Sequence, residues 1–167
     1  SNGILFNHES PVRGETFVTK KIVNGLCKIK LGMQKKLYLG NLNARRDWGH
    51  ARDFVEAMWK MLQKKTPSDY VISTGEQYSV KDFVNLVLIE LGIKFYWKGK
   101  GIKSKCFTRE GRCIVQCDKK YFRPLEVDTL QGDSRRARKE LNWKPKSNIK
   151  KLVKEMVKSE LSTFKKS

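Results

Sequence analysis

The alternation of short apolar runs with longer segments of helical periodicity constrains this fold more than any other feature of the sequence. Apolar runs occupy residues 3–6, 37–40 and 70–74, and polar or glycine residues follow them. Between these runs, apolar side chains recur three and four positions apart, which is the pattern of one buried helix face. Strands that alternate with helices in this way predict an α/β architecture in which some strands pair in parallel.

The helical segments can be placed by their start and stop residues. The first is expected over residues 15–32, and the second after Asp47, which can act as its N-cap. The third opens with an S-V-K-D capping-box pattern at residues 79–82, a short basic helix starts at Ser134, and the last helix follows Asn148. The second helix is predicted to turn one apolar face inward, made of Trp48, Ala51, Phe54, Val55, Met58, Trp59 and Leu62.

The charge of the chain raises the question of a nucleic-acid partner. The 167 residues carry a formal net charge of +19, from 36 basic and 17 acidic residues. The lysines, however, spread over the whole length, and 26 of them stand against 10 arginines, the residue that base and phosphate recognition favours. We therefore interpret the charge as a lysine-rich solvated surface and expect no nucleic-acid partner.

The spacing of the four cysteines indicates whether they bind a metal and in which cellular compartment the protein lies. Cys27, Cys106, Cys113 and Cys117 show no C-x-x-C spacing, and most of them lie far in sequence from the two histidines. We expect no metal site and reduced thiols in a cytoplasmic protein.

No apolar run approaches the roughly 20 residues that span a bilayer, so no membrane partner is expected. Because an apolar run begins almost at once after Ser1, we also expect the chain to be part of a larger protein.

His8, Glu9 and Ser10 have the residue types of a hydrolytic triad. Consecutive residues of an extended segment point to opposite faces, so these side chains cannot line up as nucleophile, base and orienting acid. The segment is instead a polar loop between the carboxyl end of a strand and a helix, where open α/β sheets bind ligands and anions are favoured. A purely structural role for His8 and for Glu15 is an equal alternative.

Two further clusters carry groups that suit a phosphorylated ligand. Arg45 and Arg46 precede a second strand-to-helix junction, where one guanidinium could fork onto a phosphate. Arg123 and Glu126 flank Pro124, so they could present a cationic fork and a hydroxyl-binding carboxylate to one ligand. Two solvated arginines are the plain alternative for the first pair, and a surface salt bridge explains the second pair better when it is taken alone. The three clusters together nevertheless favour a nucleotide sugar or a similar ligand.

No catalytic dinucleotide motif accompanies these clusters. Gly99 and Gly101 lack the third glycine of G-x-G-x-x-G. Tyr96 and Lys100 match the Y-x-x-x-K spacing of short-chain dehydrogenases, but that pair needs a helix and here lies between a strand-like run and a glycine loop. We interpret the match as chance and assign no catalytic residue to the chain.

Five segments together resemble one known family. They are "NGILFNHESPVRGETFVTKKI", "YLGNLNARRDWGHARDFVEAMW", "YVISTGEQYSVKDFV", "YFRPLEVDTLQGD" and "LNWKPK". The chain resembles the carboxyl-terminal half of the GDP-mannose 4,6-dehydratases, which are extended short-chain dehydrogenases/reductases. The resemblance covers almost the whole chain outside residues 98–117, and "LFNHESP" with "RDWGHARDFV" is its most specific part.

The resemblance implies a fold, a reaction and a set of contacts. Residues 1–167 would form the carboxyl-terminal half of an NAD(P)-binding Rossmann-type protein, with part of the parallel sheet interleaved with a smaller substrate-binding subdomain. The family converts GDP-mannose to GDP-4-keto-6-deoxymannose in GDP-fucose and deoxyhexose biosynthesis, a lyase reaction in which bound NADP takes a hydride and returns it. His8 and Arg13 would contact NADP. The contacts to GDP-mannose would be Asn7, Val18, Lys21, Arg46, Arg123 and Glu126.

The chain departs from the family pattern at two points. Many members carry R-R after N-H-E-S-P, where this chain has Val12 and Arg13, and the difference bears on the contacts of the homo-oligomer (dimer or tetramer) that the family implies. The glycine-rich NADP loop and the catalytic Thr/Ser–Glu and Tyr/Lys pairs belong to the family's amino-terminal half, so this chain alone is expected to be inactive. The alternatives are a non-catalytic GDP-sugar-binding module and another nucleotide-sugar epimerase or dehydratase.

Overall fold

The computed structural model describes residues 1–122, 125 and 127–165. Its strands are β1 (Gly3–Leu5), β2 (Asn7–Glu9), β3 (Leu37–Leu39), β4 (Arg45–Arg46), β5 (Trp48–His50), β6 (Tyr70–Ile72), β7 (Tyr78–Ser79), β8 (Phe95–Lys98), β9 (Lys105–Thr108), β10 (Cys113–Cys117) and β11 (Thr129–Leu130). Its helices are α1 (Val18–Lys30), α2 (Ala51–Leu62), α3 (Val80–Glu90), α4 (Arg135–Glu140) and α5 (Ile149–Phe164), with 3₁₀ turns at Gly101–Lys103 and Lys119–Tyr121.

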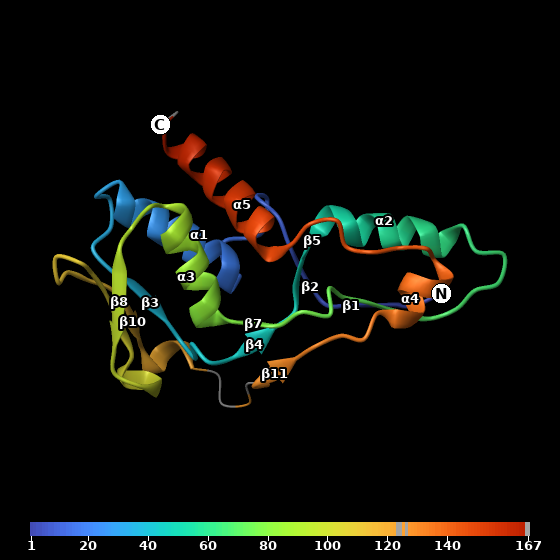
Figure 1. Cartoon of the computed structure of the whole chain (residues 1–167), viewed down its shortest axis with the longest axis horizontal. Helices are drawn as coiled ribbons and strands as arrows, with labels where there is room; N and C mark the ends of the chain where they lie inside the picture. Colours follow the sequence, from blue (N-terminus) through green and yellow to red (C-terminus); the bar gives the residue numbers. More distant parts are fainter. Residues whose placement is uncertain (123–124, 126, 166–167) are drawn as a thin grey trace.

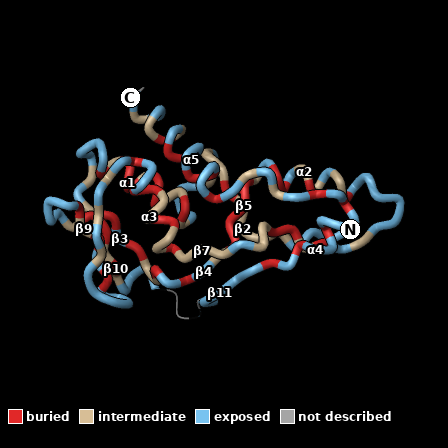
Figure 2. Tube along the Cα trace, in the orientation of Figure 1, coloured by how far each residue is buried: buried red, intermediate tan, exposed pale blue. Residues whose placement is uncertain are grey.

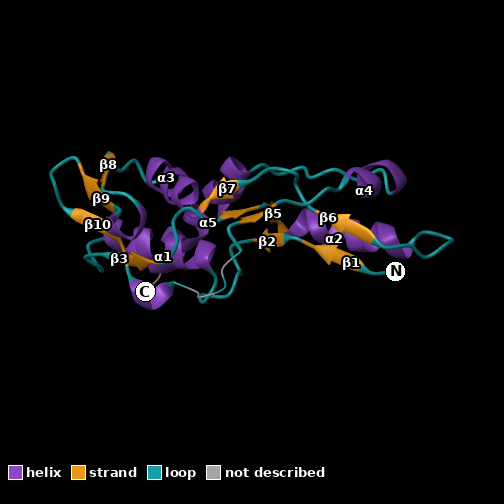
Figure 3. Cartoon of the chain, turned by 90° about the horizontal axis from the view of Figure 1, so that it is seen from below, coloured by secondary structure: helices purple, strands orange, loops and turns teal. Residues whose placement is uncertain are grey.

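The elements are arranged along one long axis (Figure 1). One end holds α1, α3 and the strands β3, β8, β9 and β10, and the other end holds α2, α4, β1 and β6. The strands β2 and β5 lie between the two ends, as the view from below shows (Figure 3). The β2–β5 pair therefore lies in the middle of the molecule.

Parallel pairs connect segments that are far apart in the sequence. β1 pairs in parallel with β6, and β2 pairs in parallel with β5, so that Asn7 lies opposite Trp48 and Glu9 lies opposite His50. β4 lies between β11, which is parallel to it, and β7, which is antiparallel. Because parallel partners run in the same direction, the residues that follow β2 and those that follow β5 leave from the same edge.

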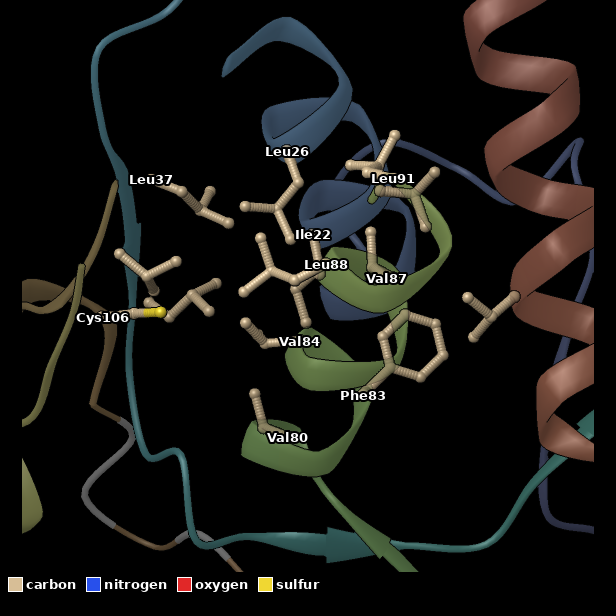
Figure 4. Packing of buried hydrophobic residues seen from close by; sticks show 14 of the residues in the cluster. Ile22, Leu26, Leu37, Val80, Phe83, Val84, Val87, Leu88, Leu91 and Cys106 are labelled. Carbon is tan, nitrogen blue, oxygen red and sulfur yellow. The ribbon is translucent and has the colours of Figure 1, made fainter. Parts of the chain in front are cut away.

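The larger apolar cluster lies between a four-stranded sheet and the helices α1 and α3. The sheet has the order β3-β10-β9-β8, with β3 parallel to β10 and the other neighbours antiparallel. Leu37 and Cys106 point from the sheet toward Ile22 and Leu26 of α1 and Leu88 of α3 (Figure 4). Full burial of such an aliphatic side chain contributes about 1.5–3 kcal/mol, so this cluster stabilises one end of the molecule.

A smaller apolar cluster holds the other end. Phe54 and Met61 of α2, Ile72 of β6 and Trp143 are buried there. The indole of Trp143 meets the Phe54 ring edge-on with centroids 6.4 Å apart, and its Nε1–H donates to the carbonyl of Asp53 at 2.8 Å. Each end of the molecule thus has its own buried residues (Figure 2).

The structure confirms the α/β architecture and most of the predicted elements. The three apolar runs form β1, β3 and β6. The third helix opens with the predicted capping box, in which Ser79 Oγ accepts from the Asp82 N–H at 3.0 Å and Asp82 Oδ2 accepts from the Ser79 N–H at 2.9 Å. α4 follows Ser134, and Asn148 Oδ1 caps α5 by accepting from the Lys151 N–H at 2.9 Å.

The predicted N-cap of the second helix is wrong. Asp47 is buried, and its carboxylate accepts hydrogen bonds from the N–H of Thr74 at 2.9 Å, the hydroxyl of Thr74 at 2.6 Å and the N–H of Gly75 at 2.8 Å. The cap is His50, whose Nδ1 accepts from the N–H of Arg52 at 3.1 Å, because the residues after Asp47 form strand β5. The first helix also begins later than predicted, at residue 18.

The predicted inner face of the second helix is wrong in part. Phe54 is fully buried, but Val55 and Trp59 are 60% exposed and Leu62 is 77% exposed. Trp48, which was included in this face, is buried in β5. The helix carries two apolar stripes, and periodicity alone cannot decide which of them packs on the sheet.

Gly49 of β5 sits where a side chain does not fit. A Cβ there would lie 2.3 Å from Cε2 of Phe54 and 3.0 Å from Cγ2 of Thr74. We predict that Gly49→Ala lowers the free energy of unfolding by about 1–3 kcal/mol, because the Phe54 ring must leave its place in the smaller cluster. Denaturant unfolding followed by tryptophan fluorescence measures the change. Gly14→Ala is the control, since its Cβ would only touch the Phe17 ring at 3.5 Å, and equal losses in both variants would contradict the prediction.

Candidate functional site

The candidate site lies along the β2–β5 pair and the loop that leads from β2 into α1. Asn7 is opposite Trp48, and Arg46 precedes Trp48 by two residues. Asn7 thus lies in the strand that pairs with β5, and Arg46 ends β4, which belongs to the separate β11-β4-β7 sheet. Both residues are half-buried, as is His8, the next residue of β2.

The ring of His8 is held from two directions. It stacks on Phe54 with centroids 4.9 Å apart and an interplanar angle of 27°. Its Nδ1 lies 2.9 Å from the carbonyl oxygen of Phe6. A carbonyl can only accept, so this contact requires a proton on Nδ1 and leaves Nε2 as the other polar atom of a fixed ring.

Arg13 reaches back from the loop to strand β2. Its Nε lies 3.1 Å from Oε2 of Glu9, and its guanidinium carbon lies 3.4 Å from the centroid of the Phe17 ring. Among the described residues no acceptor is aligned with this Nε–H, so the contact with Glu9 is a charge pair rather than a directed hydrogen bond. The side chain is 22% exposed, which leaves part of the cationic fork accessible to an anion.

Glu9 is the buried charge between the strand and the helix. The residue is 1% exposed, and its Oε2 accepts a hydrogen bond from the hydroxyl of Thr19 at 2.6 Å. Burial raises the pKa of Glu9 because the carboxylate loses its hydration, while the Thr19 hydrogen bond and the charge of Arg13 oppose the rise. Glu9 therefore ties the end of β2 to the first turn of α1.

Val18 and Lys21 lie at the beginning of α1, after the loop that follows β2. The Lys21 ammonium lies 3.4 Å from the centroid of the Tyr121 ring, a cation–π contact. Burial lowers the pKa of Lys21, and the nearby carboxylate of Asp118 opposes this effect. Val18 packs partly buried against the larger cluster. The helix is thus linked to the 3₁₀ turn that ends at Tyr121.

Arg123 and Glu126 lie outside the described residues, so their roles stay predictions. Described neighbours on both sides of them contact other site residues: Tyr121 contacts Lys21, and the carbonyl of Val127 accepts a hydrogen bond from Nη1 of Arg46 at 2.7 Å. The described residues before and after Arg123 and Glu126 therefore contact Lys21 of α1 and Arg46 of β4.

The neighbouring arginines Arg45 and Arg46 have different surroundings. Arg46 is half-buried, and its Nη1 donates to the carbonyls of Val127 at 2.7 Å and of Arg45 at 2.8 Å. Arg45 is exposed, and its Nη2 donates to the carbonyl of Gln77 at 3.2 Å. Backbone carbonyls orient both guanidinium groups, and the half-buried Arg46 lies closer in sequence to the β2–β5 pair.

Reasoning from the sequence missed the two buried carboxylates of this region. It assigned no role to Glu9 and treated Asp47 as a helix cap, whereas both side chains are buried and hydrogen-bonded within the fold. The signal that could have found them is a charged residue placed directly beside a buried strand. A charge at such a position must find a partner, because an unpaired buried charge is very costly.

The thiols of the core do not form part of the site. Cys27 and Cys106 are buried and free, and burial raises the pKa of each to about 12. Among the described residues, no three His, Cys, Asp or Glu side chains gather in a way that would hold a metal ion. The described helices also include none with the length and apolar character needed to cross a membrane.

Solved structures define the class of protein to which this fold belongs. The structure of RMD from Pseudomonas aeruginosa complexed with NADPH matches with a TM-score of 0.77 and 18% identity, covering 96% of this chain and 48% of that chain. dTDP-glucose 4,6-dehydratase from Bacillus anthracis in complex with NAD matches with a TM-score of 0.73 and 18% identity, covering 98% and 45%. The chain therefore has the α/β fold of part of an NAD(P)-binding extended short-chain dehydrogenase/reductase.

The sequence comparisons show the family within that class. Residues 1–156 match the family model described as GDP-mannose 4,6 dehydratase. GDP-mannose 4,6 dehydratase 2 of Caenorhabditis elegans is 52% identical over 161 residues, which cover 96% of this chain and 42% of that protein. The human GDP-mannose 4,6 dehydratase is 50% identical over 165 residues, which cover 98% and 44%. The chain belongs to the GDP-mannose 4,6-dehydratase family and spans less than half the length of these relatives.

The raised pKa of Glu9 makes stability depend on pH. Between the ordinary value of 4.5 and the raised value, the unfolded chain has lost the proton of Glu9 while the folded chain retains it. The free energy of unfolding therefore falls as the pH rises through this window. We predict that Glu9→Gln removes this fall, which denaturant midpoints measured from about pH 4 to about pH 8 will detect. An unchanged slope in the variant would contradict the prediction.

Proposed function

We propose that this chain forms the carboxyl-terminal half of a GDP-mannose 4,6-dehydratase and supplies most of its substrate contacts. The full-length enzyme, a lyase, would convert GDP-mannose to GDP-4-keto-6-deoxymannose and water. One observation carries the proposal. Three segments that match the family contact one another although they are separate in the sequence: β2 pairs with β5, Lys21 contacts the Tyr121 ring, and Arg46 donates to the carbonyl of Val127.

The substrate contacts divide by chemistry. The planar fork of Arg46 suits the oxygens of the diphosphate, which a guanidinium can bind in a bidentate manner. Asn7 offers both a donor and acceptor from the rigid β2–β5 pair. Val18 and Lys21 would contact the nucleotide from the first turns of α1, where the Tyr121 ring already orients the Lys21 ammonium. Arg123 and Glu126 would contact the phosphate and the ribose hydroxyls.

NADP is the proposed cofactor, with His8 and Arg13 as its contacts in this chain. These residues fit an anionic dinucleotide, because the Phe54 ring fixes the His8 imidazole and Arg13 keeps an accessible cationic fork beside a buried carboxylate. Bound NADP would supply a nicotinamide ring that accepts a hydride and returns it within one catalytic cycle. The solved neighbours with NADPH and with NAD support a nicotinamide cofactor, and the family resemblance favours NADP.

The surfaces around β1 and α2 support a division into two halves. In the described part of the chain β1 and β6 form a two-stranded parallel sheet, whereas parallel sheets are normally larger and covered on both faces. Ile4 of β1 is 57% exposed, and Val55, Trp59 and Leu62 form an outward apolar stripe on α2. We propose that the amino-terminal half of the enzyme packs against these surfaces and carries the catalytic groups.

The proposal extends to the assembly and location of the full-length enzyme. The family resemblance favours a homo-oligomer, either a dimer or a tetramer. A cytoplasmic location agrees with the free buried thiols Cys27, Cys106 and Cys117, because a reducing compartment keeps thiols in this state.

The test is an assay of GDP-mannose turnover with the full-length protein and NADP. Mass spectrometry is expected to detect a 4-keto-6-deoxy sugar nucleotide with the full-length protein and no product with the 167-residue chain alone. Absence of product from the folded full-length protein would contradict the proposal. Binding of GDP-mannose without turnover would support the alternative of a non-catalytic binding module.

Arg46 and Arg45 give a matched pair of variants in the full-length enzyme. We predict that Arg46→Ala raises the KM for GDP-mannose roughly 10- to 100-fold with a smaller change in kcat, because a hydrogen bond to a charged group contributes about 1.5–3 kcal/mol. Arg45→Ala removes an exposed guanidinium and is expected to leave KM within about twofold of wild type. Steady-state kinetics measures both values, and equal effects of the two substitutions would contradict the role of Arg46.

A further inference from the structure

We infer that Glu9 is a positioning residue that joins the cofactor side of the site to its substrate side. Its carboxylate contacts Arg13, the proposed NADP contact, and also Thr19 in the first turn of α1. That turn lies between Val18 and Lys21, the proposed nucleotide contacts. The inference rests on the proposed function, and it assigns to Glu9 the task of holding both sets of contacts in one geometry.

A single carboxylate oxygen makes both contacts. Oε2 of Glu9 lies 3.1 Å from Nε of Arg13 and accepts the hydrogen bond of the Thr19 hydroxyl at 2.6 Å. Glu9 is 1% exposed and Thr19 is fully buried. Water therefore cannot readily replace either partner, and a displacement of the carboxylate would disturb Arg13 and α1 together.

The strand pairing and the loop contacts around Glu9 hold its backbone in place. Its backbone lies at the end of β2, opposite His50 in the parallel β2–β5 pair. The loop that follows β2 is held again where the Lys20 ammonium donates to the carbonyl of Pro11 at 2.9 Å. Glu9 connects this framework to Arg13, which lies in the same loop.

The contact between Glu9 and Arg13 explains why a charged residue occupies position 9. Arg13 is long, and fixing its rotamers costs conformational entropy when a ligand binds. A buried anion on one side and the Phe17 ring at 3.4 Å on the other restrict the guanidinium before binding. Such preorganisation strengthens binding by lowering the ordering cost. An apolar residue would fill the same space but would not orient the cation.

Two substitutions separate the two contacts of Glu9. Glu9→Gln keeps an oxygen that can accept the Thr19 hydrogen bond but removes the charge beside Arg13. Thr19→Val keeps the shape of the side chain and the charge pair but removes the hydroxyl that ties α1 to the carboxylate. Each variant therefore disconnects one side of the site and leaves the other side connected.

We expect opposite effects from these variants in the full-length enzyme. Glu9→Gln should raise the Kd for NADP roughly tenfold and change the KM for GDP-mannose less than about threefold. Thr19→Val should raise the KM for GDP-mannose roughly fivefold and leave the Kd for NADP within about twofold. Fluorescence titration of NADP and steady-state kinetics measure the two quantities. If Glu9→Gln does not fold, the Thr19→Val result decides by itself, because an unchanged KM there overturns the inference.

Glu160→Gln is the matched control for removing a buried carboxylate beside α1. Glu160 is 5% exposed and accepts hydrogen bonds from Lys20 at 2.5 Å and Asn24 at 2.7 Å. This variant is expected to lower the midpoint of thermal unfolding without changing the Kd for NADP. If Glu9→Gln behaves in the same way while the wild type is active, Glu9 is only a structural residue and the inference is overturned. A wild type that neither binds NADP nor turns over GDP-mannose would instead overturn the proposed function, and the inference with it.

Discussion

The parallel pairing of β2 with β5 is the constraint on which the rest of the structure depends. It sets Asn7 opposite Trp48 and so joins two segments that are distant in sequence. Trp48 packs in the larger apolar cluster, edge-on to Phe83 at 5.2 Å, whereas Phe54, in the helix after β5, packs in the smaller one. A shift of one residue in the register would turn the strand residue Trp48 away from this cluster. The pairing therefore sets how the two ends meet, and the candidate site lies on it.

Two buried carboxylates hold the segments that flank this pair. Asp47, just before β5, accepts hydrogen bonds from Thr74 and Gly75, which follow β6. Glu9, at the end of β2, holds Thr19 on α1. Buried charges are tolerated only where partners are well placed, so each carboxylate requires one local arrangement of the chain. Apolar packing gives stability to the ends of the molecule, and these polar contacts give the site between them its geometry.

Local patterns in the sequence predicted most of the fold, and tertiary contacts explain the failures. The capping box before α3 depends only on residues next to each other in the chain, so its prediction holds. In α2 the sequence offers two apolar stripes with helical spacing, one through Phe54 and one through Val55 and Trp59. Only packing against β1 and β6 decides which stripe is buried. β4 and β11 have two residues each, too few to show any pattern. In the site, the family resemblance predicts contacts at Asn7 and Arg46, and these stay predictions. The position of Glu9 beside a strand hints at its burial, but its partners Thr19 and Arg13 follow from tertiary contacts that residue spacing does not show.

We propose that this chain contributes substrate and cofactor contacts on either side of one buried carboxylate, that of Glu9. A crystal structure of the full-length protein with GDP and NADP bound tests the claim most directly. We expect the diphosphate of GDP within hydrogen-bond distance of Arg46 and the dinucleotide against His8 and Arg13, with Glu9 still bonded to Thr19. Electron density for either ligand away from the β2–β5 pair and the start of α1 would contradict it.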